Sequence, residues 1–79
     1  MNRDSLKAAV KSALKALGGS APIIGVAREL WRQNEAELKD SGDLFFTWQY
    51  DMRWAAQKLQ KDGQLAIDKN GSHSIWRLL

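Results

Sequence analysis

The sequence contains no cysteine, which excludes a disulfide framework and a thiolate zinc site as sources of stability. His73 is the only histidine. It has no cysteine partners with which to form a metal site, and no other residues are identified that would complete a nucleophilic triad with it. The aspartates are scattered over expected caps, turns and helix surface and form no convincing acid/base pair: Asp4, Asp43, Asp51, Asp62 and Asp68. We therefore predict no catalytic residue, no metal, no cofactor and no enzymatic role for this chain.

Long apolar runs are also missing, since no stretch approaches the roughly 20 residues that span a bilayer. Near the N-terminus, Lys7, Lys11 and Lys15 stand where a signal peptide would carry its apolar segment. We therefore expect a soluble, cytoplasmic protein with no membrane partner.

The 79 residues are enough for one domain, residues 1–79, and we find no internal repeat, low-complexity tract or linker. A chain this short buries only roughly 60% of its unfolded surface. The 4 tryptophans therefore have to supply much of the buried area.

The charge balance is mildly basic, with a formal net charge of +3 and a pI near 9.5. This balance is consistent with a polyanion partner, but many proteins that touch no nucleic acid share it. The i, i+4 row of Lys7, Lys11 and Lys15 likewise fits either a solvated helix face or a line of phosphate contacts.

The first two expected elements are helices with one apolar face. Residues 5–17 form the first, with a cap at Asp4 or Ser5 and an end at Gly18-Gly19. Ser20-Ala21-Pro22 opens the second, because serine accepts hydrogen bonds from free amides and proline is tolerated in the first turn. This second helix fades near Gln33 or Asn34. Residues 35–43 are polar, with room for one further helical turn.

The third expected helix, residues 47–63, organises the rest of the chain. Its cap is Asp43 or Thr47, so residues 44–46 form either its first turn or an apolar lead-in, and Gly63 ends it. The apolar residues at i, i+4, i+7 and i+11 predict one buried face: Trp48, Met52, Ala55 and Leu59.

After Gln64 the apolar period changes from 3.6 to 2, which predicts two strands. Asn70-Gly71 between them favours a type I′ turn, because both central positions need positive φ. A turn centred there pairs Leu65 with Trp76 and Ile67 with Ser74. The predicted fold is mainly α with a small β-hairpin, a three-helix winged helix-turn-helix in the order α-α-α-β-β.

The outward face of the third helix combines hydrogen-bond donors, cations and aromatic rings, and the hairpin tip is basic and polar. Arg53 fits a guanine edge, glutamines fit adenine, and lysines fit phosphates. Each also fits an ordinary solvated surface. Tyr50 and Trp54 either contact a base methyl group or pack against the hairpin, for Trp54 against Trp76 or Ile67. The candidate DNA-binding residues are Thr47, Gln49, Tyr50, Arg53, Gln57, Lys58, Lys61, Lys69, Asn70, His73 and Arg77.

Several short motifs carry a family resemblance. The order is Trp54-Ala55, Leu59, residues 63–65 (GQL), Gly71 and residues 75–78 (IWRL). This pattern resembles the N-terminal winged-helix domain of Mrr-type restriction proteins, and the likeness is good over residues 46–78 and loose over 34–43. The connection between the second and third helices departs from a simple helix-turn-helix, because it is longer than three or four residues.

The resemblance implies a module that presents double-stranded DNA, such as foreign or modified DNA, to a nuclease domain further along a longer chain. It carries over no catalytic residue. Leu79 follows directly on the last strand, which fits either an excised domain or a compact free-standing protein.

Three functions stay open at this point. The leading hypothesis is a duplex-DNA-binding winged helix that acts as the reading part of a restriction or defence-type protein. The second is a protein-interaction or homodimer surface that uses the surplus aromatic residues, which are enriched in such interfaces. The third is a single-stranded nucleic acid stacked on exposed rings.

Overall fold

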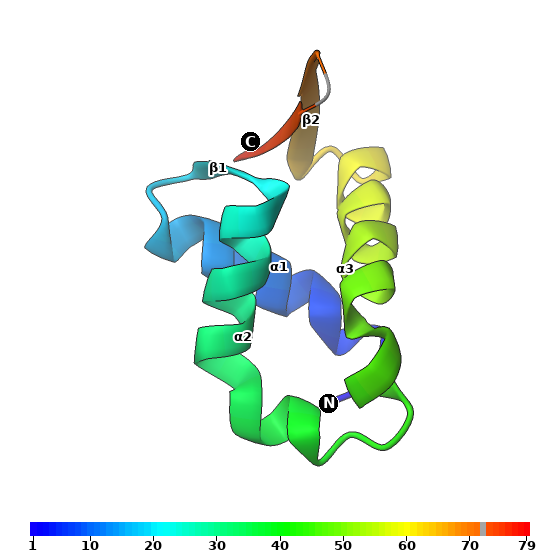
Figure 1. Cartoon of the computed structure of the whole chain (residues 1–79). Coiled ribbons are helices and arrows are strands. Elements are labelled where there is room, and N and C mark those ends of the chain that lie inside the picture. The colour runs from blue at the N-terminus through cyan, green and yellow to red at the C-terminus, as the bar shows by residue number, and fades with distance from the viewer. Residues whose placement is uncertain (72) are drawn as a thin grey trace.

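In the computed structural model, which describes residues 1–71 and 73–79, three helices support a three-stranded antiparallel sheet (Figure 1). The helices are α1 (Ser5–Ala16), α2 (Ile23–Lys39) and α3 (Leu44–Lys61). The strands are β1 (Ser20–Pro22), β2 (Leu65–Asn70) and β3 (His73–Leu78). Helix α1 crosses behind α2 and α3, and the β2–β3 hairpin stands at the C-terminal end of α3. The mainly α fold with a hairpin is confirmed, and it is a winged-helix-like arrangement.

Strand β1 corrects the prediction that Ser20-Ala21-Pro22 opens the second helix. These residues pair antiparallel with β3, with Ser20 opposite Arg77 and Pro22 opposite Ile75. β1 is an edge strand in the sheet order β1-β3-β2, and an edge tolerates a proline that cannot donate a ladder hydrogen bond. Pairing with a distant strand therefore outweighs the local capping signal, and the observed order is α-β-α-α-β-β.

Helix α2 extends beyond the predicted end, but it bends there. Asn34 has non-helical backbone angles (φ −129°, ψ 16°), and its side-chain Nδ2 donates a hydrogen bond to the Leu30 carbonyl at 2.9 Å. The predicted end at Gln33 or Asn34 thus marks a kink. The buried side chain of Leu38 explains why the helix continues, because it gives the last turn an anchor in the core.

Helix α3 begins at Leu44 with Asp43 in the N-cap position, so residues 44–46 are its first turn. Asp43 makes no side-chain capping hydrogen bond. The C-terminal end follows the prediction, because Gly63 takes a φ of 74° that side chains with a Cβ rarely adopt. The chain reverses at this glycine and returns as β2.

The hairpin register differs from the prediction by two residues. Leu65 lies opposite Leu78 and Ile67 opposite Trp76, and Asn70 pairs with His73 next to the turn. A shift of two keeps the same side chains on the same face, because the strand period is 2. The observed register gives Leu78 a partner that the predicted one would have left unpaired.

The core lies where the three helices meet the inner face of the sheet. Trp76 of β3 is buried at its centre, and the ring of Trp48 stacks on Trp31 of α2 with centroids 5.8 Å apart. The largest other fully buried side chains come from all three helices and β2: Leu6, Val10, Leu14, Val26, Leu30, Leu38, Met52 and Leu65.

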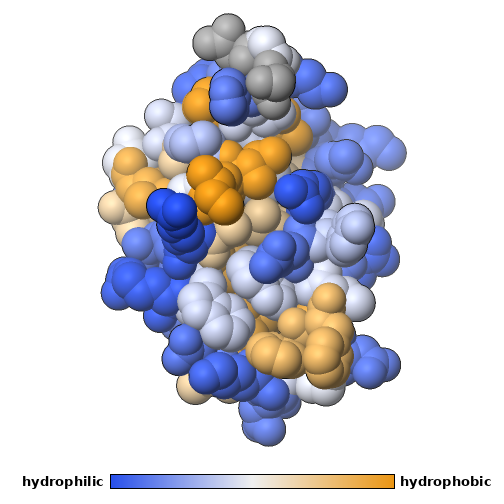
Figure 2. Space-filling view, in the orientation of Figure 1, coloured by the Kyte–Doolittle hydropathy of each residue, from blue (hydrophilic) through white to orange (hydrophobic). Residues whose placement is uncertain are grey.

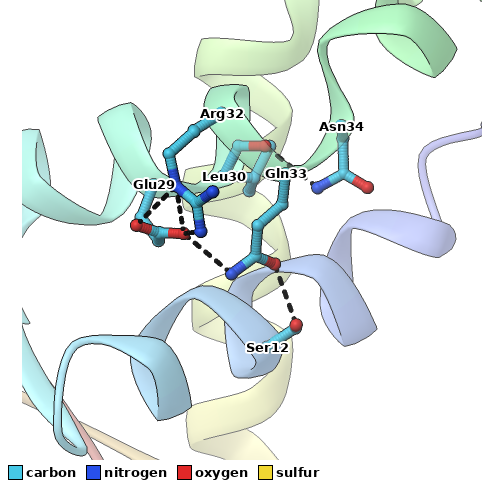
Figure 3. A network of polar contacts seen from close by, with 6 residues as sticks. All are labelled: Ser12, Glu29, Leu30, Arg32, Gln33 and Asn34. Carbon is cyan, nitrogen blue, oxygen red and sulfur yellow. Dashed lines mark hydrogen bonds and ion pairs between the residues drawn. The ribbon is translucent and has the colours of Figure 1, made fainter.

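A polar network fixes α2 against α1 (Figure 3). Ser12 of α1 donates a hydrogen bond to Gln33 at 2.9 Å, and Gln33 donates to the Glu29 carboxylate at 2.9 Å. The Nε atom of Arg32 also donates to Glu29, at 2.9 Å. The hydrogen bond from Arg32, and to a smaller extent the one from Gln33, lowers the pKa of Glu29. The hydrogen bond between Arg32 and Glu29 also raises the pKa of Arg32. The network therefore favours a charged carboxylate at this helix contact.

Candidate nucleic-acid interface

The outward face of α3 is exposed as its period predicts. Tyr50 is 77% exposed, and Gln49, Arg53 and Gln57 are exposed too. Opposite them, Trp48 and the other core residues of the helix are buried. Tyr50 is therefore a surface residue. The sequence had left open whether the rings of Tyr50 and Trp54 are exposed or buried.

A groove runs between α3, the hairpin and the start of α2. On the helix side, Arg53 and Gln57 line it together with Gln60. On the hairpin side, it is lined by Lys69 and Ser74 with Ile67 and Trp76 below them, and Ile23 closes the end. The alternation of the strands explains this, because Lys69 and Ser74 are partners on the same face as Ile67 and Trp76.

The exposed cations of α3, together with Lys69 of β2, lack acidic partners among the described residues. Among residues 1–71 and 73–79, the ion pairs within 4.0 Å involve Arg3, Lys7, Arg32, Lys39 and Arg77. Arg53, Lys58, Lys61 and Lys69 have none within that range. Arg53 donates one hydrogen bond to the Gln49 carbonyl at 3.2 Å and otherwise faces solvent. The charge of α3 and of Lys69 is thus available to an external anion.

Trp54 lies on the other flank of α3. Its ring is half-buried, with the Arg3 guanidinium carbon 3.8 Å from the ring centre. The Nζ atoms of Lys7 and Lys58 lie 5.5 and 5.9 Å from it. The predicted packing partners, Trp76 and Ile67, instead line the groove described above.

Thr47, another candidate, also lies on the Trp54 flank. Its hydroxyl donates a hydrogen bond to Asp51 at 2.8 Å, and Asp51 forms an ion pair with Arg3 at 3.5 Å. The side chain of Thr47 therefore helps to position Arg3 next to Trp54 and does not line the groove.

The hairpin candidates divide between its two faces. Lys69 faces the groove, whereas His73 and Arg77 belong to the opposite face of the ladder. Arg77 is held by Asp68, with Nε 3.2 Å from the carboxylate. The side chain of Asn70 and all of Ser72, which the sequence places at the wing tip, lie outside what the structure describes.

A second, apolar groove lies between α2 and α3. It is lined by Ile24, Ala27, Arg28, Trp31, Phe45, Trp48 and Gln49. Ile24 is 60% exposed, and the neighbouring Phe46 is 80% exposed with its ring 5.0 Å from that of Phe45. Figure 2 shows separate hydrophobic patches on this face with hydrophilic side chains between them.

The sequence analysis did not identify Gln60, Ser74 or Arg3 as part of these surfaces. Gln60 follows Arg53 at i+7 and Gln57 at i+3, so helical spacing could have found it. Ser74 alternates with Trp76 on the same strand face, so strand period could have found it too. Arg3 precedes α1 and reaches Trp54 through the tertiary fold, and no local signal indicates that contact.

The structure also bears on metal binding and on membrane crossing. Within the part of the chain that the structure describes, no group of three histidine, aspartate or glutamate side chains is placed to hold a metal ion. No helix in residues 1–71 and 73–79 is long and apolar enough to cross a membrane.

Comparisons with protein-family models, with curated proteins and with solved structures found no match for this chain.

Proposed function

We propose that this chain binds duplex DNA, with α3 in the major groove and the β2–β3 hairpin against the phosphate backbone. The observation that carries the proposal is the groove shared by Arg53 of α3 and Lys69 of β2. Among the described residues, neither cation has a carboxylate within 4.0 Å. An α-helix with its side chains is about 10–12 Å across, which matches the roughly 12 Å width of the major groove.

The proposed roles follow from the position of each side chain. In this proposal Arg53 donates two hydrogen bonds to a guanine edge, and Gln57 and Gln60, which line the same groove, supply amides that pair with adenine. The exposed ring of Tyr50 contacts the methyl group of thymine or 5-methylcytosine. Lys69 supplies a phosphate contact that positions the protein without reading sequence.

The resemblance to the Mrr-type domain extends this proposal to a restriction or defence-type protein. In that setting the chain reads DNA, and cleavage belongs to a nuclease domain elsewhere in a longer chain. The proposal assigns no catalysis to the residues of this chain, and a preference for methylated over unmethylated duplex would support the defence role.

The test compares two variants that lose the same charge from different surfaces. Arg53→Gln/Lys69→Gln removes the two groove cations, and Arg28→Gln/Lys39→Gln removes two exposed cations from α2. In fluorescence anisotropy with a labelled random duplex at 50 mM salt, we expect the first variant to bind at least about tenfold more weakly than wild type, because two phosphate or base contacts are lost. The second should bind within about twofold. Equal affinity of both variants would refute the groove as the interface.

A second candidate function is protein interaction through the apolar groove between α2 and α3. The observation that favours it is the exposure of Ile24 at the groove and of Phe46 beside Phe45, which lines the groove, because exposed apolar clusters of this kind mark interfaces. Sedimentation that depends on concentration, and that Ile24→Ser/Phe46→Ser abolishes, would support a homodimer. A wild-type chain that stays monomeric at millimolar concentration would argue against it.

A further inference from the structure

Three cations surround the ring of Trp54, although they come from two separate parts of the chain. Arg3 and Lys7 come from the start of the chain and from α1, and Lys58 comes from α3. Lys61 lines the same surface depression as Trp54 and Lys58. We call these four cations and Trp54 the Trp54 cluster.

The local acidic residues pair with two of the four cations of the Trp54 cluster and leave the other two unpaired. Asp51 lies 3.5 Å from Arg3, and Asp4 lies 3.8 Å from Lys7. Lys58 and Lys61 have no carboxylate within 4.0 Å among residues 1–71 and 73–79. Bringing like charges together costs free energy that a bound anion would recover. The half-buried ring holds the cations in place through cation–π contacts while the side chains of Arg3 and Lys7 stay accessible.

The position of the cluster around α3 indicates which anion it fits. At 100° per residue, Arg53 and Lys58 lie about 140° apart around the helix axis. The hairpin groove and the Trp54 cluster are therefore on opposite flanks of the exposed face that carries Tyr50. In Figure 1 the hairpin stands at the C-terminal end of α3, and the N-terminal part of α1 lies behind the helix.

We propose that the Trp54 cluster binds phosphates of the second strand of the duplex whose major groove α3 enters, while Lys69 binds phosphates of the first. This inference rests on the proposed function. A helix seated in the major groove has one phosphate backbone along each flank, and each flank of α3 here carries its own cations.

An extended polyanion fits this surface better than a single phosphate ion does. The cations form a row, because Lys7 and Lys11 are one turn apart on α1 and Lys58 and Lys61 are nearly one turn apart on α3. Lys11 continues the row toward the hairpin and donates a hydrogen bond to Gln64 at 2.7 Å. No single pocket gathers them all.

The first test measures how affinity for a random duplex depends on salt in Lys58→Gln/Lys61→Gln, which removes the two cations of the Trp54 cluster that have no carboxylate within 4.0 Å among the described residues. Each phosphate contact contributes about 0.9 to the slope of log affinity against log salt. We therefore expect the slope to become shallower by about 1.8, so that the loss of affinity between 50 and 200 mM salt becomes about tenfold smaller. The control, Arg28→Gln/Lys39→Gln, removes two exposed cations of α2, of which Lys39 is paired with Glu35, and should keep the wild-type slope.

The second test needs no variant at the cationic positions. In NMR spectra of the wild-type chain, addition of unlabelled duplex should shift the Trp54 indole N–H and the backbone amides of residues 3 and 7. Trp54→Phe identifies the indole signal, because it removes that resonance and keeps an aromatic ring.

The outcomes separate this inference from the proposed function. Wild type that binds duplex with the same slope as Lys58→Gln/Lys61→Gln, or with no shift at Trp54, overturns the inference and leaves the proposed function standing. Wild type that binds no duplex at low salt overturns both.

Discussion

Arg53 of α3 and Lys69 of β2 line the same groove, although a complete chain reversal separates them in the sequence. Gly63 makes the reversal possible, because its positive φ lets the chain leave the helix and return beside it. The hairpin register then directs Lys69 to the face of the sheet that meets α3. Neither residue type would indicate an interface alone, but their convergence places two uncompensated cations on one surface.

Arg53→Gln should reduce discrimination between DNA sequences more than it reduces binding to random DNA. A bidentate arginine contact to guanine contributes about 1–3 kcal/mol of discrimination, so preference for a selected site should fall by about 5- to 150-fold. Selection of binding sites from a random duplex pool, repeated with Arg53→Gln, measures this effect. Lys15→Gln is the matched control, and identical selected sites for Arg53→Gln and wild type would contradict the prediction.

Lys69→Gln and Arg77→Gln should differ in their effect on the salt dependence of DNA binding, although both remove one cation from the hairpin. Lys69 faces the groove without an acidic partner, whereas Arg77 faces the other side and pairs with Asp68. We expect Lys69→Gln to make the salt slope shallower by about 0.9, and Arg77→Gln to leave it nearly unchanged. A larger effect at Arg77 would mean that the opposite face of the hairpin contacts DNA.

The Glu29 network predicts a loss of stability in acid. Hydrogen bonds from Arg32 and Gln33 lower the pKa of Glu29 below its ordinary value of 4.5. The carboxylate therefore adds stability that is fully present above about pH 4.5 and is lost as the pH falls through the lowered folded-state pKa. Urea unfolding between pH 2.5 and 7 should show that Glu29→Gln lowers the free energy of unfolding at neutral pH and flattens its decline in acid.

The control for this measurement is Glu37→Gln. It removes another acid from α2 for which no ion pair is found among the described residues. Its pH profile should parallel that of wild type. If Glu29→Gln also paralleled wild type, the network would add nothing to stability.

Trp76→Ala should be among the most damaging substitutions. Trp76 is buried, and its strand position pairs with Ala21 on one side and Ile67 on the other. Removing a buried tryptophan side chain costs about 3–5 kcal/mol. Tyr50→Ala, at an exposed position, should change the free energy of unfolding by less than about 0.5 kcal/mol. Equal costs in urea unfolding would contradict the assigned core.

The helices and the hairpin could be predicted because their signals are local. Apolar spacing located all three helices, and Gly63 and the change of period located the hairpin. Strand β1 could not be predicted, because Ser20-Ala21-Pro22 is extended only through its pairing with β3, far along the chain. The hairpin register was wrong for a related reason: the turn signal at Asn70-Gly71 competes with the pairing of Leu65 with Leu78.

The candidate site also has one part that could be predicted from the sequence and one part that could not. Exposure of Tyr50 and Arg53 follows from the helical period, so the sequence was sufficient for the outer face of α3. Whether Lys69 or His73 meets that face depends on which side of the sheet packs against the helix. The contact of Arg3 with Trp54 depends on how α1 crosses α3. Such relationships are tertiary, and a single sequence does not contain a local signal for them.

The central claim, binding of duplex DNA through phosphate contacts, is tested most directly by the salt dependence of wild-type binding to a random duplex. Three of the cations proposed to contact phosphates have no carboxylate within 4.0 Å among the described residues: Lys58, Lys61 and Lys69. At about 0.9 per contact, the slope of log affinity against log salt should be about −2.7. A slope near zero, or no binding at low salt, would contradict the claim and favour the apolar groove between α2 and α3 as the working surface.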